Sequence, residues 1–198
     1  MRQRLLFGIA QSCAAGGYRA CTVEDVLVRS NTSREEFDVR FKSLDDCLEA
    51  AFSGYVNAFL TSATSQYSPD KPLFQVVIDA LAGILDLLES SPAYARMVFL
   101  ECRTATPRTE QLYRSVVDVM TSLLEQLRVD SPPGIEPPAS AARTAVGGVE
   151  SMIRDELISG QHGLPELLSS AVYCSLVSFL GQEEALLRSR SARSPRLT

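Results

Sequence analysis

The sequence predicts an all-α protein, and two observations carry this prediction. Apolar residues recur at i, i+3 and i+4 along most of the 198 residues, whereas the strict alternation that marks half-buried strands is not sustained anywhere. Hydrophobic residues make up 45% of the chain, which is enough for a packed core. No apolar run reaches the roughly 18 residues of a membrane-spanning helix, and polar residues soon interrupt the first apolar stretch, unlike a signal peptide. We therefore expect a cytoplasmic protein.

The first 50 residues predict four helices in close succession. The first spans about 4–15, with an apolar stripe on one face, and the Gly16-Gly17 pair ends it. Three helix-start signals follow, each with a hydroxyl residue and a carboxylate three residues later: Thr22 with Asp25, Ser33 with Glu36, and Ser43 with Asp46. They predict helices at about 22–29 and 33–40 and another that begins near Leu44. Only Ser30, Asn31 and Thr32 separate the second and third helices, which indicates a helix-turn-helix.

The remainder of the chain predicts further helices, separated by proline and glycine. Pro92 and Pro107 each mark a boundary, the proline-rich loop at 130–138 cannot be helical, and glycines lie at both ends of the segment 160–163. The predicted helices are 44–67, with a break at 68–72, then 73–90, 93–104, 107–128, 139–159 and 164–187.

The sequence contains no pattern typical of a metal site or a catalytic centre. Its five cysteines are widely spaced with no C-x-x-C pair, and it has one histidine, so we expect no zinc site, no disulfide framework and no cofactor. The simplest interpretation is that the cysteines are small apolar residues of a core. A glycine-rich phosphate loop and a nucleophile elbow are both absent, and we therefore predict that the chain is not an enzyme.

Residues 9–52 resemble the DNA-binding domain of the TetR (tetracycline-repressor) family without a gap. The matching positions are Gly17-Tyr18, Thr22-Val23, Val26, Thr32-Ser33, Phe37, Phe41 and the segment from Ser43 to Leu48. Residues 164–187 are similar to the last helix of a subgroup of that family. The resemblance implies a helix-turn-helix domain at 1–45 and a ligand-binding and dimerisation domain at 46–187. The arginine- and serine-rich residues 188–198 are expected to form a disordered tail.

The resemblance also implies a function. A TetR-type regulator, in most cases a repressor, forms a homodimer through its last two helices. The dimer binds double-stranded operator DNA of palindromic sequence, and a small effector releases it from the DNA. On this basis the predicted DNA contacts are Thr22, Thr32, Ser33, Arg34, Glu35, Arg40 and Lys42. The apolar stripes predicted for the dimer are Val146, Val149, Ile153 and Leu157, then Leu168, Val172, Leu176 and Phe179.

The predicted effector site lies on the apolar faces of the successive helices behind the DNA-binding domain. Its residues are Tyr55, Phe59, Leu81, Met97, Leu100, Glu101, Tyr113, Met120 and Met152, for which ordinary core packing is the alternative interpretation. These helices carry few charges, so the expected effector is mostly apolar or aromatic. Glu101 and Arg103 interrupt an apolar stretch, and we expect each to be paired, exposed or available to a polar group of the ligand.

The third helix departs from the family pattern because it carries Glu35, Glu36 and Asp38. Carboxylates repel the phosphates of DNA, although a glutamate can also accept a hydrogen bond from the amino group of cytosine. Glu36 has a second role as the acid of the capping box. The acids favour an alternative hypothesis, an orphan ligand-sensing or interaction protein with the TetR fold that no longer binds DNA tightly.

Overall fold

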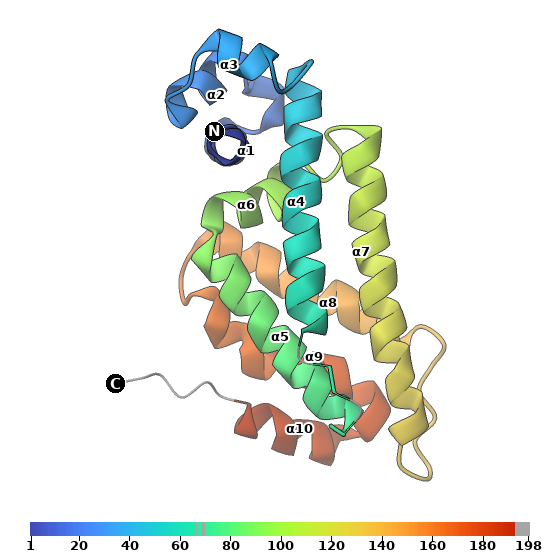
Figure 1. The fold of residues 1–198 in the computed structure, drawn as a ribbon. Helices are drawn as coiled ribbons and strands as arrows, with labels where there is room; N and C mark the ends of the chain where they lie inside the picture. Colours follow the sequence, from blue (N-terminus) through green and yellow to red (C-terminus); the bar gives the residue numbers. More distant parts are fainter. Residues whose placement is uncertain (66, 69, 193–198) are drawn as a thin grey trace. The chain divides into compact units, whose positions relative to one another are not determined.

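The computed structural model describes residues 1–65, 67–68 and 70–192, and within these ranges it contains ten α-helices and no strand (Figure 1). The all-α prediction is confirmed. The chain forms two compact units. Unit 1 comprises Met1–Ala58 and Ser91–Ser115, and unit 2 comprises Phe59–Ser90 and Val116–Thr198. Within the described residues no helix is both long and apolar enough to cross a lipid bilayer.

Unit 1 is built from the N-terminal helices and from the segment around residue 100. Its elements are α1 (Arg2–Gly16), η1 (Tyr18–Ala20), α2 (Val23–Ser30), α3 (Arg34–Asp38), most of α4 (Leu44–Thr64), α6 (Pro92–Arg96), the π-helical turn η2 (Met97–Glu101) and the start of α7 (Pro107–Glu125). Its core contains Leu5, Ile9, Val26, Phe37, Leu48, Phe52 and Met97, all of which are at most 1% exposed.

A close contact between α1 and α2 fixes the N-terminal helices (Figure 1). A side chain at Gly8 would place its Cβ 2.9 Å from the carbonyl oxygen of Val26, so only glycine permits this approach. Arg4 of α1 extends across the contact, where its Nε donates to the carbonyl of Ser30 (3.0 Å) and its guanidinium donates to the carbonyl of Asn31. A cation at the C-terminal end of a helix stabilises that helix. The two hydrogen bonds of Arg4 therefore tie α1 to the turn after α2.

Unit 2 has α9 (Leu168–Leu180) at its centre, in contact with α5 (Leu73–Ser90), α8 (Ala141–Ser159) and α10 (Gln182–Ser191). Two 3-10 turns, η3 (Gln126–Asp130) and η4 (Leu164–Leu167), complete it. The core consists of Leu85, Leu88, Leu127, Val172, Leu176 and Phe179, each at most 1% exposed.

The C-terminal part of the chain differs from the single helix predicted at 164–187. Gly181 adopts φ 82° and ψ 169°, outside the helical region, and separates α9 from α10. This backbone conformation favours glycine, and a Cβ at Gly181 would in addition lie 2.7 Å from Cδ1 of Ile135, so the end of that side chain would have to move. The predicted disordered tail is also partly helical, since α10 continues to Ser191. Residues 193–198 of that tail lie outside the described residues, as does Pro69 in the predicted break after the fourth helix.

Three other predicted helices have different bounds. The third is shorter than 33–40, and the fourth ends at Thr64 rather than near 67. The predicted helix at 93–104 is α6 followed by η2, where the N–H of Cys102 donates to the carbonyl of Met97 (2.8 Å), five residues earlier. This longer spacing is that of a π-helix.

Two carboxylates hold the loop between α8 and η4 in unit 2. Glu156 accepts hydrogen bonds from the backbone N–H groups of His162 and Gly163, both at 2.8 Å, and these bonds lower its pKa. Glu89 of α5 accepts from the N–H of Leu164 (3.0 Å). The loop therefore has a fixed conformation although its sequence is rich in glycine.

Candidate DNA-binding surface and ligand cavity

The helix-turn-helix begins with a capping box at α2. The hydroxyl of Thr22 accepts from the N–H of Asp25 (3.2 Å), and the Asp25 carboxylate accepts from the N–H of Thr22 (2.9 Å). The hydrogen bonds from Thr22 lower the pKa of Asp25. Both groups satisfy N–H donors that the first helical turn leaves unpaired.

A second capping box starts α3 and accounts for one of its three acids. Ser33 Oγ accepts from the N–H of Glu36 (3.2 Å), and the Glu36 carboxylate accepts from the N–H of Ser33 (2.9 Å). The turn before it requires a left-handed residue, and Asn31 takes φ 49°, which asparagine tolerates well. The role of Glu36 in the capping box was correctly predicted from the spacing.

Phe37 anchors α3 to the core of unit 1. It is the one buried residue of this five-residue helix, and its ring lies 5.7 Å from that of Phe41. The other four residues of α3 are exposed or half-buried, as a DNA-reading helix requires. Thr32 is half-buried, with its hydroxyl 2.6 Å from that of Ser30, so it forms part of the turn as well as part of the surface.

Some charged side chains on the exposed surface of the helix-turn-helix have a partner of opposite charge, and others do not. Arg34 contacts Asp38 (3.0 Å) and Glu24 (3.3 Å), so two carboxylates compete for its charge. Arg40 donates to the backbone carbonyl of Glu36 (2.9 Å). This hydrogen bond holds the side chain in place, and no carboxylate of the described residues forms an ion pair with it. Lys42 and Glu35 are exposed, and neither side chain has a charged partner among the described residues.

Tyr18 links the turn before α2 to the first turn of α4. Its hydroxyl donates to the carboxylate of Asp45. Burial, and then the contact with this carboxylate, raise the pKa of Tyr18, so the phenol stays protonated as a donor. This hydrogen bond therefore ties the turn between α1 and α2 to the start of α4 within unit 1.

Five of the nine residues predicted for the effector site lie in unit 1. Tyr55 stacks on Tyr94, with ring centroids 5.2 Å apart, and its hydroxyl lies 3.1 Å from that of Ser91. Burial raises the pKa of Tyr55 to about 12. Met97 is fully buried and Leu100 is half-buried.

The two charged residues near η2 have separate environments in unit 1. Glu101 is half-buried, and its carboxylate would lie 3.0 Å from a Cβ placed on Gly17, so it lies against the turn after α1. Arg103 lies over the ring of Tyr113, 5.5 Å from its centroid, as a cation–π pair. Arg103 is therefore paired with a neighbour, which is one of the three arrangements expected for it: paired, exposed or available to a polar group of a ligand.

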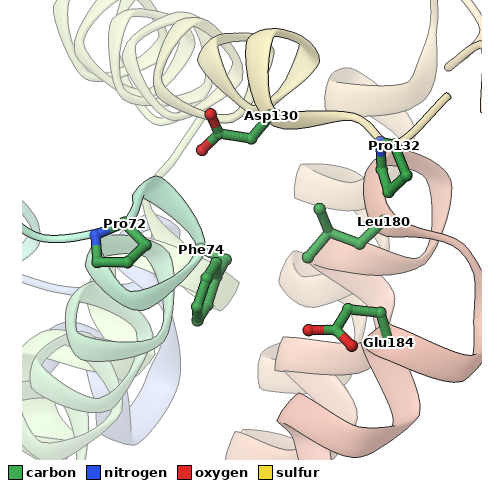
Figure 2. A pocket seen from close by; sticks show the side chains of 6 residues that line it. All are labelled: Pro72, Phe74, Asp130, Pro132, Leu180 and Glu184. Atoms are coloured by element: carbon green, nitrogen blue, oxygen red, sulfur yellow. The ribbon is translucent and has the colours of Figure 1, made fainter.

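The other four predicted effector residues, Phe59, Leu81, Met120 and Met152, lie in unit 2, where Phe59 is buried and the others are half-buried. Unit 2 also contains a cavity of about 500 Å³ that is open to solvent (Figure 2). Its lining comes from the start of α5, from the end of η3 and the loop after it, and from the junction of α9 and α10: Pro72, Phe74, Asp130, Pro132, Leu180 and Glu184. None of the nine predicted residues is among them.

One wall of this cavity carries a charged pair. Arg188 binds Glu184 (2.6 Å) and lies 4.1 Å from the centroid of the Phe74 ring. Sequence reasoning missed the cavity because its lining residues come from three separate segments, 72–74, 130–132 and 180–184, and the last of these bends at Gly181.

The comparisons with known proteins concern the fold. No model of a protein family matches the chain, and no curated protein matches it in sequence. Solved structures match throughout its length. The fatty acid degradation regulator FadR from Bacillus halodurans is 12% identical, with a TM-score of 0.76, over 90% of this chain and 98% of FadR. FadR from Bacillus subtilis, solved with stearoyl-CoA, is 14% identical, with a TM-score of 0.74, over 91% and 99%.

A third match comes from a different genus. TylP from Streptomyces fradiae, described as a TetR regulator, is 19% identical, with a TM-score of 0.65, over 94% of this chain and 89% of TylP. These matches, together with the capped helix-turn-helix, agree with the resemblance found in the sequence. The chain has the all-α, two-domain fold of the TetR-family transcriptional regulators.

Proposed function

We propose that this chain is a transcriptional regulator of the TetR type, a cytoplasmic repressor that binds a palindromic operator as a homodimer and is released by a small, mostly apolar effector. The observation that carries the proposal is the helix-turn-helix, with both of its helices fixed by capping boxes and α3 exposed outside Phe37. The neighbours in fold support it because their descriptions name them as regulators. We assign the chain no catalytic role.

In this proposal the DNA contacts divide by chemistry. Arg40 and Lys42, whose charges no acid neutralises, bind phosphates, and the hydroxyls of Thr22 and Ser33 donate to phosphates near the helix starts. Arg34 and Glu35 on the exposed face of α3 contact base edges. Such a site has half-sites about one helical turn apart, or a small multiple of this spacing, on the operator.

The proposal is tested with the DNA upstream of the protein's own gene. Fluorescence anisotropy at several salt concentrations gives the number of phosphates neutralised, since each one adds about 0.9 to the slope of log K against log salt. Arg40→Ala and Lys42→Ala should each reduce this slope by about one unit. Arg143→Ala is the matched control, because Arg143 is an exposed arginine of α8 in unit 2 and should leave the slope unchanged. Equal slopes in all four proteins would argue against this DNA surface.

A second candidate function is an orphan sensor that has the fold but does not bind DNA tightly. The pairing of Arg34 with Asp38 and Glu24 favours it, because a neutralised arginine contributes little to phosphate binding. The double variant Glu35→Gln, Asp38→Tyr discriminates between the two candidates. It removes two negative charges and releases Arg34 from Asp38, so a DNA-binding protein should bind more tightly. If neither operator nor random duplex is bound better, the orphan sensor is the better description.

The homodimer requires an apolar surface that is not already used in the core, and the structure changes the predicted residues. The apolar pattern placed Ile153 of α8 and Leu168, Val172, Leu176 and Phe179 of α9 in the dimer, but all five are buried within unit 2 and cannot form the interface. Half-exposed apolar residues remain on the same two helices, Val146 and Val149 on α8 and Tyr173 and Val177 on α9. We propose these as the centre of the dimer.

A stable dimer of this kind should bury more than roughly 1,200 Å² in total. Light scattering at micromolar concentration should give twice the mass of the chain, and Val149→Glu should shift it towards the monomer. Glu150→Gln, one residue along the same helix, serves as a control for a change of charge. A wild-type monomer would exclude this assembly.

For the effector we propose a ligand with an apolar chain, and the stearoyl-CoA bound by FadR from Bacillus subtilis is a suitable probe. A ligand that binds only the folded protein raises its unfolding temperature, and the rise grows with the logarithm of ligand concentration once that concentration exceeds the Kd. Stearoyl-CoA should stabilise the chain, and coenzyme A without the acyl group, the matched control, should not. Leu81→Ala and Phe74→Ala locate the site, because Leu81 belongs to the predicted set and Phe74 lines the open cavity.

Release of DNA requires a further observation. A ligand shifts an equilibrium only when it binds the two states with different affinity. Stearoyl-CoA should therefore weaken DNA binding in the anisotropy assay and bind less tightly in the presence of DNA. Stabilisation without any change in DNA affinity would show that this ligand is not the effector.

A further inference from the structure

The open cavity of unit 2 combines apolar surface with negative charge. Two of its six lining residues, Asp130 and Glu184, are acids, and the other four are apolar. No basic side chain is among the described residues that line it. Its volume of about 500 Å³ lies within the range of roughly 300–1,000 Å³ that is typical of small-molecule sites. The size therefore suits a small organic ligand, and the charge favours a cation.

The lining residues lie on facing sides of the cavity (Figure 2). Phe74, at the start of α5, lies on one side, and Leu180, the last residue of α9, lies on the other. Asp130, at the end of η3, lies at the edge between these two sides. Glu184 of α10 lies on the side of Leu180, and its carboxylate points towards Phe74. A ligand between Phe74 and Leu180 would meet apolar surface on both flanks and a carboxylate at its end.

The two acids differ in how far their charge is already compensated. Glu184 forms an ion pair with Arg188 of the same helix (2.6 Å). Asp130 is exposed, and its carboxylate has neither a hydrogen bond nor an ion pair with any other described residue. An exposed carboxylate loses little hydration when a cation binds it, so the pair is weakly favourable. Asp130 is therefore the acid whose charge is left for a ligand.

One wall of the cavity already binds a cation of the chain itself. The guanidinium of Arg188 lies 4.1 Å from the centroid of the Phe74 ring, within the roughly 6 Å over which a ring attracts a cation. The same guanidinium is held by Glu184. The ring and this carboxylate thus form a surface that attracts positive charge, and Arg188 competes there with any cation that enters the cavity.

We propose that the open cavity of unit 2 is a binding site for a small organic cation, a protonated amine on an aromatic or aliphatic body. The ammonium group pairs with Asp130, and the body lies between Phe74 and Leu180. The acyl-CoA suggested as effector carries negative phosphates, which the two acids repel. This site is therefore separate from the effector site, and the proposal does not rest on the proposed function.

The test compares two probes that share one body. 2-Phenylethylammonium carries the positive charge, and 2-phenylethanol has a neutral hydroxyl in its place. Both are titrated into the full chain, and binding is followed by calorimetry at low ionic strength. The ammonium ion should bind at least about threefold more tightly, because an exposed ion pair and a cation–π contact each add a modest factor. This advantage should shrink as salt is added, since salt screens exposed charges.

Four variants locate the interaction. Asp130→Asn should remove most of the advantage of the ammonium ion, and Phe74→Leu, which keeps an apolar side chain but loses the ring, should reduce it. Arg188→Gln should increase the affinity for the ammonium ion, because it removes the competing cation and frees Glu184. Asp155→Asn is the matched control: Asp155 is an exposed aspartate of α8 in unit 2 that does not line the cavity.

Several results would overturn the proposal. The alcohol would bind as tightly as the ammonium ion, Asp155→Asn would have the same effect as Asp130→Asn, or Arg188→Gln would weaken binding. Loss of the stabilisation by stearoyl-CoA in Phe74→Ala would place the acyl ligand in this cavity and would also contradict it. A chain that binds no DNA would contradict the proposed function alone, because the two titrations do not depend on DNA.

Discussion

Phe37→Ala should remove α3 from the structure, and the size of the effect follows from its burial. Phe37 is 1% exposed and is the one buried residue of a five-residue helix. Truncation of a buried phenylalanine to alanine costs about 3–5 kcal/mol, and a helix of this length does not persist without tertiary contacts. Since whole proteins are stable by about 5–15 kcal/mol, the loss should be visible both in stability and in DNA binding.

The assay combines urea unfolding, followed by circular dichroism, with anisotropy on the upstream DNA. Val39→Ala is the control in the same segment, because Val39 is 76% exposed and such substitutions change stability by at most about 0.5 kcal/mol. Phe37→Leu, which retains most of the volume, should cost less than about 1.5 kcal/mol. The reasoning is refuted if Phe37→Ala costs less than about 1 kcal/mol, or if Val39→Ala weakens DNA binding as strongly.

Four further substitutions test local features. Ser33→Ala removes the cap of α3 and should lower stability by about 1 kcal/mol in the same urea assay. Glu156→Gln removes a carboxylate whose pKa is lowered by two backbone donors. The advantage of the wild type should therefore be complete above the unfolded-state pKa of about 4.3 and shrink as pH falls through the lower folded-state value, and a pH-independent difference would contradict this. Gly181→Ala should cost at least about 1–2 kcal/mol because of its positive φ, whereas Gly54→Ala, in open space on a helix, should stabilise by about 1 kcal/mol in thermal unfolding.

Local features of the fold could be predicted from the sequence because their causes are local. The capping boxes at Thr22 and Ser33 depend on two residues three positions apart, and both are present as predicted. The turn at Asn31 has the same origin, since its length and its left-handed residue are readable from the chain. The starts of both helices of the helix-turn-helix were therefore predicted to within one residue, whereas the end of α3 was placed two residues too late.

Features that depend on neighbours from elsewhere in the chain could not be predicted. The apolar stripe of α9 showed that one face is covered, but not that α5 and α8 of the same chain cover it. The cavity beside Phe74 depends in the same way on the bend at Gly181.

The capping boxes of α2 and α3 have a consequence for how this protein could acquire new targets. The hydroxyls and acids of the caps, together with Val26 and Phe37, fix the two helices from their ends and from the inside. The outward positions, Arg34, Glu35 and Asp38, are left with little part in stability. Their identity is free to vary without loss of the fold, so under the proposed function a library restricted to these three positions should yield variants that remain folded and differ in the DNA sequence they select.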